Sequence, residues 1–112
     1  MSKLTLGEHQ ELFAHHLALL IQKAHALGYR VRMGEVYRTP EQQKIYVDTG
    51  RSKTMDSAHL KKCAIDLHFT ASGEVCYPET LGKYWEGLDQ ANSAGMFWKS
   101  FKDAPHFERK TK

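Results

Sequence analysis

The sequence lacks a long apolar run. No stretch of the 112-residue chain approaches the roughly 20 consecutive apolar residues needed to cross a bilayer, so we expect no membrane insertion. The first residues also lack the apolar stretch of a secretory signal, so we expect a protein made in the cytoplasm and at first confined there. Hydrophobic residues at 41% and charged residues at 26% are typical of an ordinary globular protein.

Cysteine is scarce. Cys63 and Cys76 are too few for a disulfide framework. They flank an expected hairpin, so a bridge between them is conceivable, but without a secretory signal we expect two reduced, packed thiols. The sequence contains no C-x-x-C pair, and a zinc site made of cysteines is therefore the weaker hypothesis.

Neither sign of charge dominates. The chain has 16 Lys and Arg against 13 Asp and Glu, for a net charge of +3. This falls short of the basic character typical of nucleic-acid-binding domains, so we expect no nucleic-acid partner. A nucleic-acid-binding domain has only the charge in its favour, and it predicts salt-sensitive binding to DNA. A mild positive charge would help approach to any polyanion, although ordinary solubility explains it equally well.

The length and the absence of repeats or linkers predict a single domain over residues 1–112. Residues 6–27 form the clearest element, an amphipathic helix. Thr5 and Glu8 form a capping box at its start, and Gly28 ends it. Apolar side chains recur at helical spacing along it: Leu12, Phe13, Leu17, Leu20, Ile21, Ala24 and Leu27.

A strand and a second helix follow. Residues 29–38 alternate between arginine and apolar side chains, which predicts a half-buried strand, and the alternation breaks near Gly34, where a bulge is expected. Pro40 to Asp48 predicts a helix with Thr39 as its cap and Gln42 completing the capping box.

The rest of the chain predicts an antiparallel sheet. Ile65 and Leu67 alternate with Asp66, so their face belongs to the core, and Asp66 faces a cleft or solvent. We expect an α+β fold, a small antiparallel sheet with helices packed on one face. The expected elements, with Gly95 ending the helix, are a strand, a turn, a return strand, a helix and a last strand at 63–70, 71–73, 74–77, 79–93 and 105–109.

His59, Asp66 and His106 are the strongest candidates for chemistry. Two imidazoles and one carboxylate are a ligand set of catalytic zinc sites, which keep a fourth position open for water. His59 would lie in a loop, Asp66 on the strand that follows, and His106 on the terminal strand beside it. A hydrolytic role favours zinc, although non-haem iron uses the same ligand types.

Three further residues could serve such a site. Asp103 lies three residues before His106, and a carboxylate there could accept a proton from bound water and pass it to a leaving amine. Glu108 faces the same side of a strand as His106, either as a rival base or as an orienting partner of a ligand imidazole. Arg38 could bind a substrate carboxylate or a developing oxyanion, although a surface arginine is an equally good interpretation.

Taken together, these residues resemble the zinc D-alanyl-D-alanine carboxypeptidase / L-alanyl-D-glutamate endopeptidase family of bacterial cell-wall enzymes, especially its phage endolysins. The motifs follow the family's order. They are Tyr37-Arg38-Thr39-Pro40-Glu41-Gln42-Gln43, then Ser57-x-His59-x6-Asp66-Leu67, then Trp98 and Asp103-x-Pro105-His106-Phe107-Glu108.

The resemblance implies one zinc ion, held by His59, Asp66 and His106. It also implies Asp103 as the general base, where many relatives carry Glu, and Arg38 as a residue that stabilises the substrate or transition state. Ser57 belongs to the matching motif and is a further candidate for substrate binding. The family fold is a small α+β fold shared with the hedgehog signalling domain.

One position departs from the family pattern. Relatives usually carry glycine three residues after the first histidine, and this chain has Lys62 there. A backbone conformation that glycine adopts freely would be harder for lysine. We therefore expect differences from the family to lie in the loop near His59 and in its substrate contacts. We expect the metal ligands to be retained.

The resemblance favours an L-alanyl-D-glutamate endopeptidase that cuts peptidoglycan stem peptides. A D-alanyl-D-alanine carboxypeptidase is the close alternative, and a non-catalytic, zinc-containing binding module is the alternative from another class. Asp103 speaks against the binding module, which has no need of that carboxylate. We expect a monomer that reaches the cell wall after release from the cytoplasm, as a phage or prophage lysis enzyme would.

Overall fold

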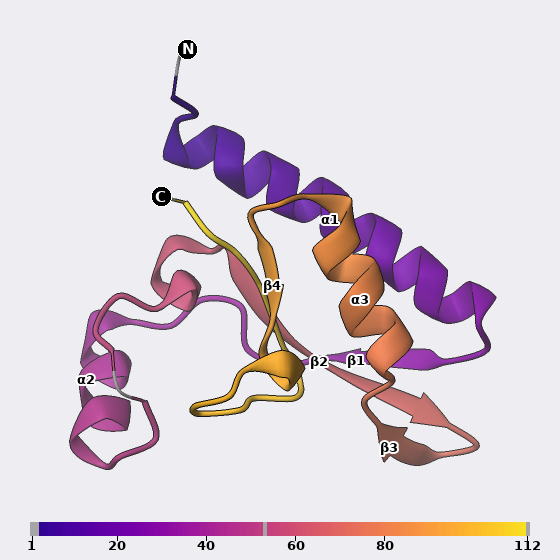
Figure 1. Cartoon of the computed structure of the whole chain (residues 1–112). Coiled ribbons are helices and arrows are strands. Elements are labelled where there is room, and N and C mark those ends of the chain that lie inside the picture. Colours follow the sequence, from indigo (N-terminus) through magenta and orange to yellow (C-terminus); the bar gives the residue numbers. More distant parts are fainter. Residues whose placement is uncertain (1–2, 53, 112) are drawn as a thin grey trace.

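The computed structural model describes residues 3–52 and 54–111 (Figure 1). Its longest element is α1, Leu6–Ala26, which runs across one side of the molecule. The capping box is present, with the Thr5 hydroxyl accepting from the Glu8 amide and the Glu8 carboxylate accepting from the Thr5 amide. Gly28 follows the helix with φ +93, a left-handed conformation that glycine adopts without strain. The predicted start and end of this helix are confirmed.

The strands form one antiparallel sheet in the order β1-β2-β5-β4, with β3 also paired to β2. With the helices, this is the small α+β architecture expected from the sequence. The strands are β1 Arg30–Met33, β2 Ala64–Ala71, β3 Glu74–Cys76, β4 Asn92–Ala94 and β5 His106–Arg109.

β2 is the strand that organises the sheet, because it pairs with β1, β3 and β5. Side chains alternate along it, so Ile65, Leu67 and Phe69 are buried in the core as predicted. Asp66 lies on the opposite face, directly across from His106 of β5. Because the apolar side chains of β2 must face the core, the alternation sets Asp66 on the face that carries the site.

Two helices cover the core face. α1 contacts α3, Glu79–Leu88, and both contact the sheet. Trp85 of α3 is fully buried, and its ring meets Phe13 and Phe107 edge to face at centroid distances of 5.6 and 5.9 Å. Its indole N–H donates to the Glu108 carbonyl at 3.0 Å, which satisfies the one polar atom of a buried ring.

A β-bulge follows β1, as expected near Gly34. The Gly34 amide donates to the Asp66 carbonyl at 2.7 Å, and the Asp66 amide donates to the Glu35 carbonyl at 3.0 Å, so two residues face one. A Cβ at Gly34 would lie 3.2 Å from the Asp66 Cβ. Because glycine has no side chain, the backbone at Gly34 can pass close to Asp66 before it turns toward the site.

The expectation that the helices pack on one face is wrong for α2, Pro40–Asp48. Thr39 caps it as predicted, accepting from the Gln42 amide. Its one buried residue is Gln43, a polar side chain, and Ile45 is 53% exposed. With no apolar stripe to bury, α2 stands apart from α1 and α3 on the side of the molecule where β1 leads out of the sheet (Figure 1).

The helix predicted over 79–93 is also wrong in its second half. α3 ends at Leu88, and Asn92, Ser93 and Ala94 form β4, paired with β5. Asp89 accepts from the Ala91 amide, and the Asn92 amide side chain donates to the Trp85 carbonyl. Such short polar side chains form hydrogen bonds that compete with those of the helical backbone, so the helix ends here. The residues that follow pair with the edge of β5 instead. Gly95 therefore follows a strand.

Cys63 and Cys76 are free thiols, and burial raises the pKa of the Cys63 thiol. Within residues 3–52 and 54–111, the helices are all too short or too polar to span a bilayer.

We predict that Gly95→Ala destabilises the protein by about 2 kcal/mol, the usual scale of overpacking. An added Cβ would collide with the Asp103 carbonyl oxygen and lie 3.0 Å from the His106 Cβ. The measurement is urea unfolding. Gly87→Ala is the matched control, because nothing lies within 4 Å of its Cβ position on α3, and it should gain up to about 1 kcal/mol. Equal midpoints for Gly95→Ala and the wild type would contradict this account.

Candidate metal centre

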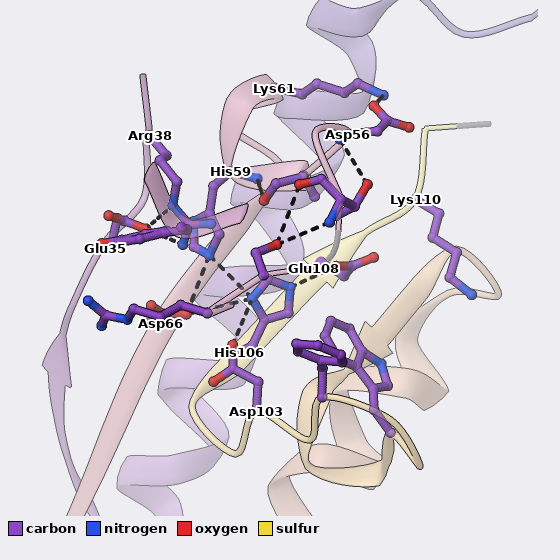
Figure 2. A pocket seen from close by; sticks show the side chains of 18 of the residues that line it. Glu35, Arg38, Asp56, His59, Lys61, Asp66, Asp103, His106, Glu108 and Lys110 are labelled. Atoms are coloured by element: carbon purple, nitrogen blue, oxygen red, sulfur yellow. Dashed lines mark hydrogen bonds and ion pairs between the residues drawn. The ribbon is translucent and has the colours of Figure 1, made fainter. Parts of the chain in front are cut away.

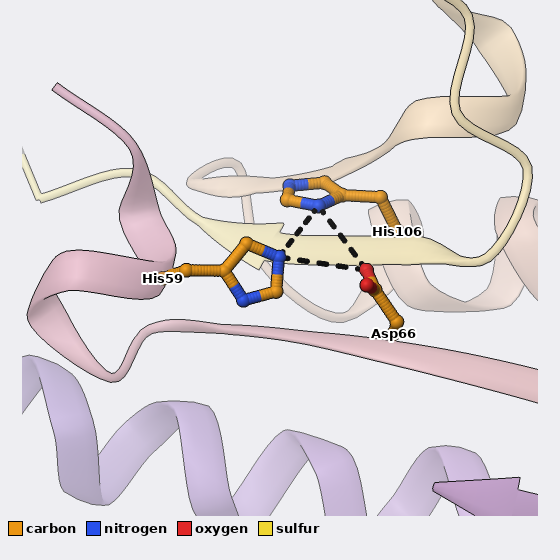
Figure 3. A group of neighbouring side chains, drawn as sticks. All are labelled: His59, Asp66 and His106. Carbon is orange, nitrogen blue, oxygen red and sulfur yellow. Dashed lines mark hydrogen bonds and ion pairs between the residues drawn. The ribbon is translucent and has the colours of Figure 1, made fainter. Parts of the chain in front are cut away.

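Three elements bring His59, Asp66 and His106 to one point, as the sequence predicted (Figure 3). The His59 Nε2 lies 3.2 Å from the His106 Nδ1. The Asp66 Oδ1 lies 3.4 Å from the first of these nitrogens and 3.6 Å from the second. All three candidate ligand atoms are within 4.8 Å of one another, close enough to share a single cation.

His59 lies on a short 3-10 helix, η1, Ala58–Lys61. Ser57 begins this turn, since its hydroxyl accepts from the His59 amide at 3.3 Å. Lys62 ends it with φ 57 and ψ 34, the left-handed conformation that glycine would adopt freely. The loop thus keeps the conformation despite the lysine, whose ammonium lies 5.4 Å from the centre of the Tyr37 ring.

The second nitrogen of the His59 ring fixes its orientation. The Nδ1 lies 2.9 Å from the Val36 carbonyl, a group that can only accept. The proton therefore belongs on Nδ1, and the Nε2 lone pair faces the other two residues. His59 is 1% exposed, so the packing around it also restricts the ring.

His106 is oriented in the same way, by Glu108. Its Nε2 lies 2.7 Å from the Glu108 Oε1, which leaves the Nδ1 facing the centre. Trp98 packs against the ring at a centroid distance of 4.9 Å, and its own N–H donates to the Ser93 hydroxyl. Of the two roles left open for Glu108, this contact supports the orienting one. No local pattern predicted this contact of Trp98, which depends on the tertiary fold.

Asp66 supplies the negative charge. Its Oδ1 is buried and has no hydrogen-bond partner among residues 3–52 and 54–111. Burial alone would raise the pKa of this carboxyl, but the nearby imidazoles of His106 and His59 outweigh it and hold the pKa well below its usual range. The residue is thus an ionised, half-buried carboxylate whose buried oxygen faces two imidazole nitrogens.

This donor set fits a divalent metal ion. Burial lowers the pKa of His106, but its contacts with Asp66 and Glu108 outweigh that and raise it to about 9. Two facing imidazole nitrogens 3.2 Å apart favour a positive charge between them, which a proton could supply. A metal ion would supply the same charge and would also bind the unpartnered Asp66 oxygen.

Asp103 stands beside the cluster. Its backbone carbonyl accepts from the His106 amide, and its amide donates to the Gly95 carbonyl, so the turn is tied at both ends. Its Oδ2 lies 3.8 Å from the His106 Nδ1. Burial, with repulsion from Asp66, raises the pKa of the Asp103 carboxyl despite the nearby His106. A pKa shifted toward neutrality suits a group that accepts and returns a proton.

The cluster lies in a cleft of about 810 Å³ (Figure 2). The residues that line it include Asp103, Trp98, Tyr46, Ser52 and Ser57. The volume falls within the range of small-molecule and peptide-fragment sites. Ser57, predicted to bind substrate, does line the cleft, although its hydroxyl is already engaged in capping η1.

Arg38 lines the same cleft, but its charge is not free. Its guanidinium forms an ion pair with Glu35, with Nε donating at 2.6 Å, and its Nη1 donates to the Gln43 Oε1 at 2.7 Å. Its side chain is 12% exposed. The bulge after β1 is what brings Glu35 beside it.

Gln43 was not recognised from the sequence as a site residue, although it closes the matching motif. It is fully buried, and its Nε2 donates to the Ser52 hydroxyl at 3.0 Å and to the Thr54 carbonyl at 2.5 Å. A buried glutamine with its amide fully used ties the loop after α2 to Arg38. A polar residue in the middle of a helix with few apolar neighbours was the signal that could have revealed it.

No protein-family model matches the chain, and no curated protein matches it significantly. Among solved structures, the chain is similar to the crystal structure of the Serratia marcescens L-Ala D-Glu endopeptidase ChiX. The TM-score is 0.69 at 22% sequence identity, and the match covers 88% of this chain and 77% of that chain. The two proteins share a fold.

We predict that the protein binds one Zn²⁺ per chain and releases about one proton on binding at pH 7. His106 is protonated in the metal-free protein because its pKa is about 9, and a ligand imidazole must be neutral. Apparent affinity should therefore rise with pH up to about 9 and then level off. Calorimetric titration in buffers of different ionisation enthalpy measures both effects.

Two variants control the zinc titration. His59→Ala should lose saturable binding, whereas His25→Ala, an exposed histidine on α1, should keep it. Wild-type binding with no proton release, or with an affinity independent of pH, would contradict the assigned charge state.

We predict that Glu108→Gln weakens zinc binding by about 10- to 100-fold, the usual effect of losing an orienting partner. The amide can still accept from the His106 Nε2–H, but it no longer makes the ring more basic. Competition with a chromophoric chelator measures the affinity. Glu74→Gln, an exposed change on β3, is the control. Equal affinities for both variants would remove Glu108 from the site.

Proposed function

We propose that this protein is a zinc-dependent peptidase of the bacterial cell wall, which hydrolyses the bond between L-Ala and D-Glu in peptidoglycan stem peptides. The observation that carries the proposal is the buried Asp66 oxygen without a hydrogen bond, facing two oriented imidazole nitrogens in an open cleft. The fold shared with an L-Ala D-Glu endopeptidase supports the choice of substrate.

His59, Asp66 and His106 would hold the metal ion through Nε2, Oδ1 and Nδ1. When bound, zinc supplies a water molecule of lowered pKa and an electrophile that polarises the scissile carbonyl. The protein keeps this chemistry in place with ligands that come from a sheet and a capped turn. The Val36 carbonyl and Glu108 prevent the rings from turning away.

Asp103 would move the proton. Its carboxylate accepts a proton from the attacking water and gives it to the nitrogen of the leaving amine, so the group ends each turnover as it began. Its position beside the His106 Nδ1 supports this role, and its raised pKa makes it a stronger base for accepting the proton. Glu108 is already hydrogen-bonded to the His106 Nε2, the ring nitrogen that faces away from the cluster, so we assign it the orienting role.

Arg38 would bind the substrate by donating hydrogen bonds, because Glu35 already balances its positive charge. Glu35 and Gln43 accept from its Nε, Nη1 and Nη2, and an arginine has five N–H groups, so N–H groups remain for a peptide carbonyl. Its amide also donates to the His59 carbonyl, which ties it to the candidate metal centre. Arg38 would therefore position the substrate and would not act as its counter-ion.

Digestion of purified peptidoglycan by the zinc-loaded protein tests the proposal, with mass spectrometry of the fragments. New C-terminal L-Ala and N-terminal D-Glu ends support it. Release of D-Ala would instead identify a D-alanyl-D-alanine carboxypeptidase. Binding to the wall with no new ends would identify a non-catalytic module. Metal analysis of the active protein distinguishes zinc from iron.

We predict that Asp103→Asn keeps zinc affinity and lowers the rate of wall digestion by about 10²- to 10⁴-fold, the range for loss of a general base. Residual zinc binding is measured by calorimetry and the rate by released amino groups. Asp48→Asn, which removes an exposed carboxylate of α2 paired with Lys44, is the control and should stay active. Full activity of Asp103→Asn would assign the base to another group.

A further inference from the structure

The cleft contains more positive side chains than the proposed mechanism uses, and most already have partners. Arg38 is balanced by Glu35. Lys61 pairs with Asp56 at 3.2 Å, and Arg109 pairs with Asp89 at 3.2 Å. The cations that line the cleft without an ion pair, within residues 3–52 and 54–111, are Arg51, Lys102 and Lys110.

Arg51 differs from the two lysines because its head group is held in place. Its Cζ lies 4.8 Å from the centre of the Tyr46 ring, and the Arg38 Cζ lies 4.6 Å from the same ring. The backbone is also fixed, since the Arg51 amide donates to the Tyr46 carbonyl at 2.7 Å, just after α2. An ordered guanidinium loses less entropy on binding than a free lysine does.

Stacking leaves the guanidinium able to bind a ligand. A guanidinium that stacks on an aromatic ring uses its flat face, whereas its N–H bonds point outward from the edge. That edge matches a carboxylate through two parallel hydrogen bonds. Because Tyr46 also contacts Arg38, whose amide is bonded to the His59 carbonyl, the Arg51 head group belongs to the wall next to the candidate metal centre.

We propose that Arg51 binds the free carboxylate of the substrate next to the scissile bond; this rests on the proposed function. A glutamate residue in a peptide keeps one free carboxyl group whichever carboxyl group continues the chain, so an L-Ala–D-Glu bond has an anion beside it unless that group is amidated. Arg38 is already neutralised by Glu35 and hydrogen-bonded to Gln43, so we assign this charge to Arg51.

Two synthetic peptides test this inference on the zinc-loaded protein. Both contain the L-Ala–D-Glu bond and have the same length, but in one a carboxamide replaces the free carboxylate. The wild type should prefer the carboxylate peptide by about 10- to 100-fold in kcat/KM, mainly through KM, the range expected for a paired charge. Arg51→Met should cleave both peptides at the wild-type rate for the carboxamide.

Lys102→Met is the matched control, a second cation of the cleft with no ion pair among the described residues, and it should retain the preference. Arg51→Lys should keep part of it. The inference is overturned if Arg51→Met retains the preference, or if it slows both peptides equally, which would indicate a structural role. Thermal unfolding of each variant confirms that exposed Arg51 is dispensable for folding.

Binding measurements separate this inference from the proposed function. Calorimetry with both peptides is performed on zinc-loaded wild type and Arg51→Met. If neither peptide is cleaved but the wild type binds the carboxylate peptide about 10-fold more tightly and Arg51→Met does not, the peptidase proposal fails and the carboxylate site stands. Equal affinities of the wild type for the two peptides overturn the carboxylate site, whatever the cleavage result.

Discussion

The antiparallel register of β2 and β5 is the constraint on which the site depends. It sets Asp66 opposite His106, so two candidate ligands 40 positions apart share one face of a rigid sheet. The opposite face of the same pairing buries Ile65 against Phe107 in the core. A shift of the register by one residue would turn an apolar side chain toward solvent and a carboxylate into the core, so the hydrophobic core enforces the geometry of the candidate metal centre.

Around this pair, each imidazole is held by a group of a different kind. A backbone carbonyl orients His59, and a carboxylate orients His106. Burial lowers the pKa of His106, but Asp66 and Glu108 outweigh it and raise this pKa to about 9, which favours a proton on this ring. A metal ion would compete with that proton for one place, and the negative charge of Asp66 would stabilise either cation. This competition avoids an uncompensated buried charge in either state.

The two walls of the cleft are built on different principles. The wall with Gly95, Asp103 and His106 belongs to the sheet and its tightly packed turn. The wall with α2 has almost no apolar core, and a buried glutamine and two arginines around Tyr46 hold it together. Polar contacts give directional placement without the area of a hydrophobic interface. The proposed chemistry therefore lies on the wall formed by the sheet, and the proposed substrate recognition lies on the polar one.

Local sequence signals determined much of this protein. The capping box of α1, the Thr39 cap, the alternation in β2 and the bulge at Gly34 were all readable, because each depends on residues close together in the chain. The three candidate ligands were also named correctly as neighbours. Lys62 was expected to need a conformation that favours glycine, and its φ of 57 agrees.

Other features depend on contacts that no local pattern specifies. β4 replaced the end of a predicted helix because β5 offered it a free edge. Three features of the site are of this kind. They are the ion pair of Arg38 with Glu35, the packing of Trp98 on His106, and the charge of Arg51, which lies over the Tyr46 ring and has no ion pair among the described residues. The sequence alone indicated which residues are candidates for chemistry, three of which lie together in the structure. The tertiary structure decided their partners and thus their charge, because ion pairing and burial are properties of three-dimensional neighbours.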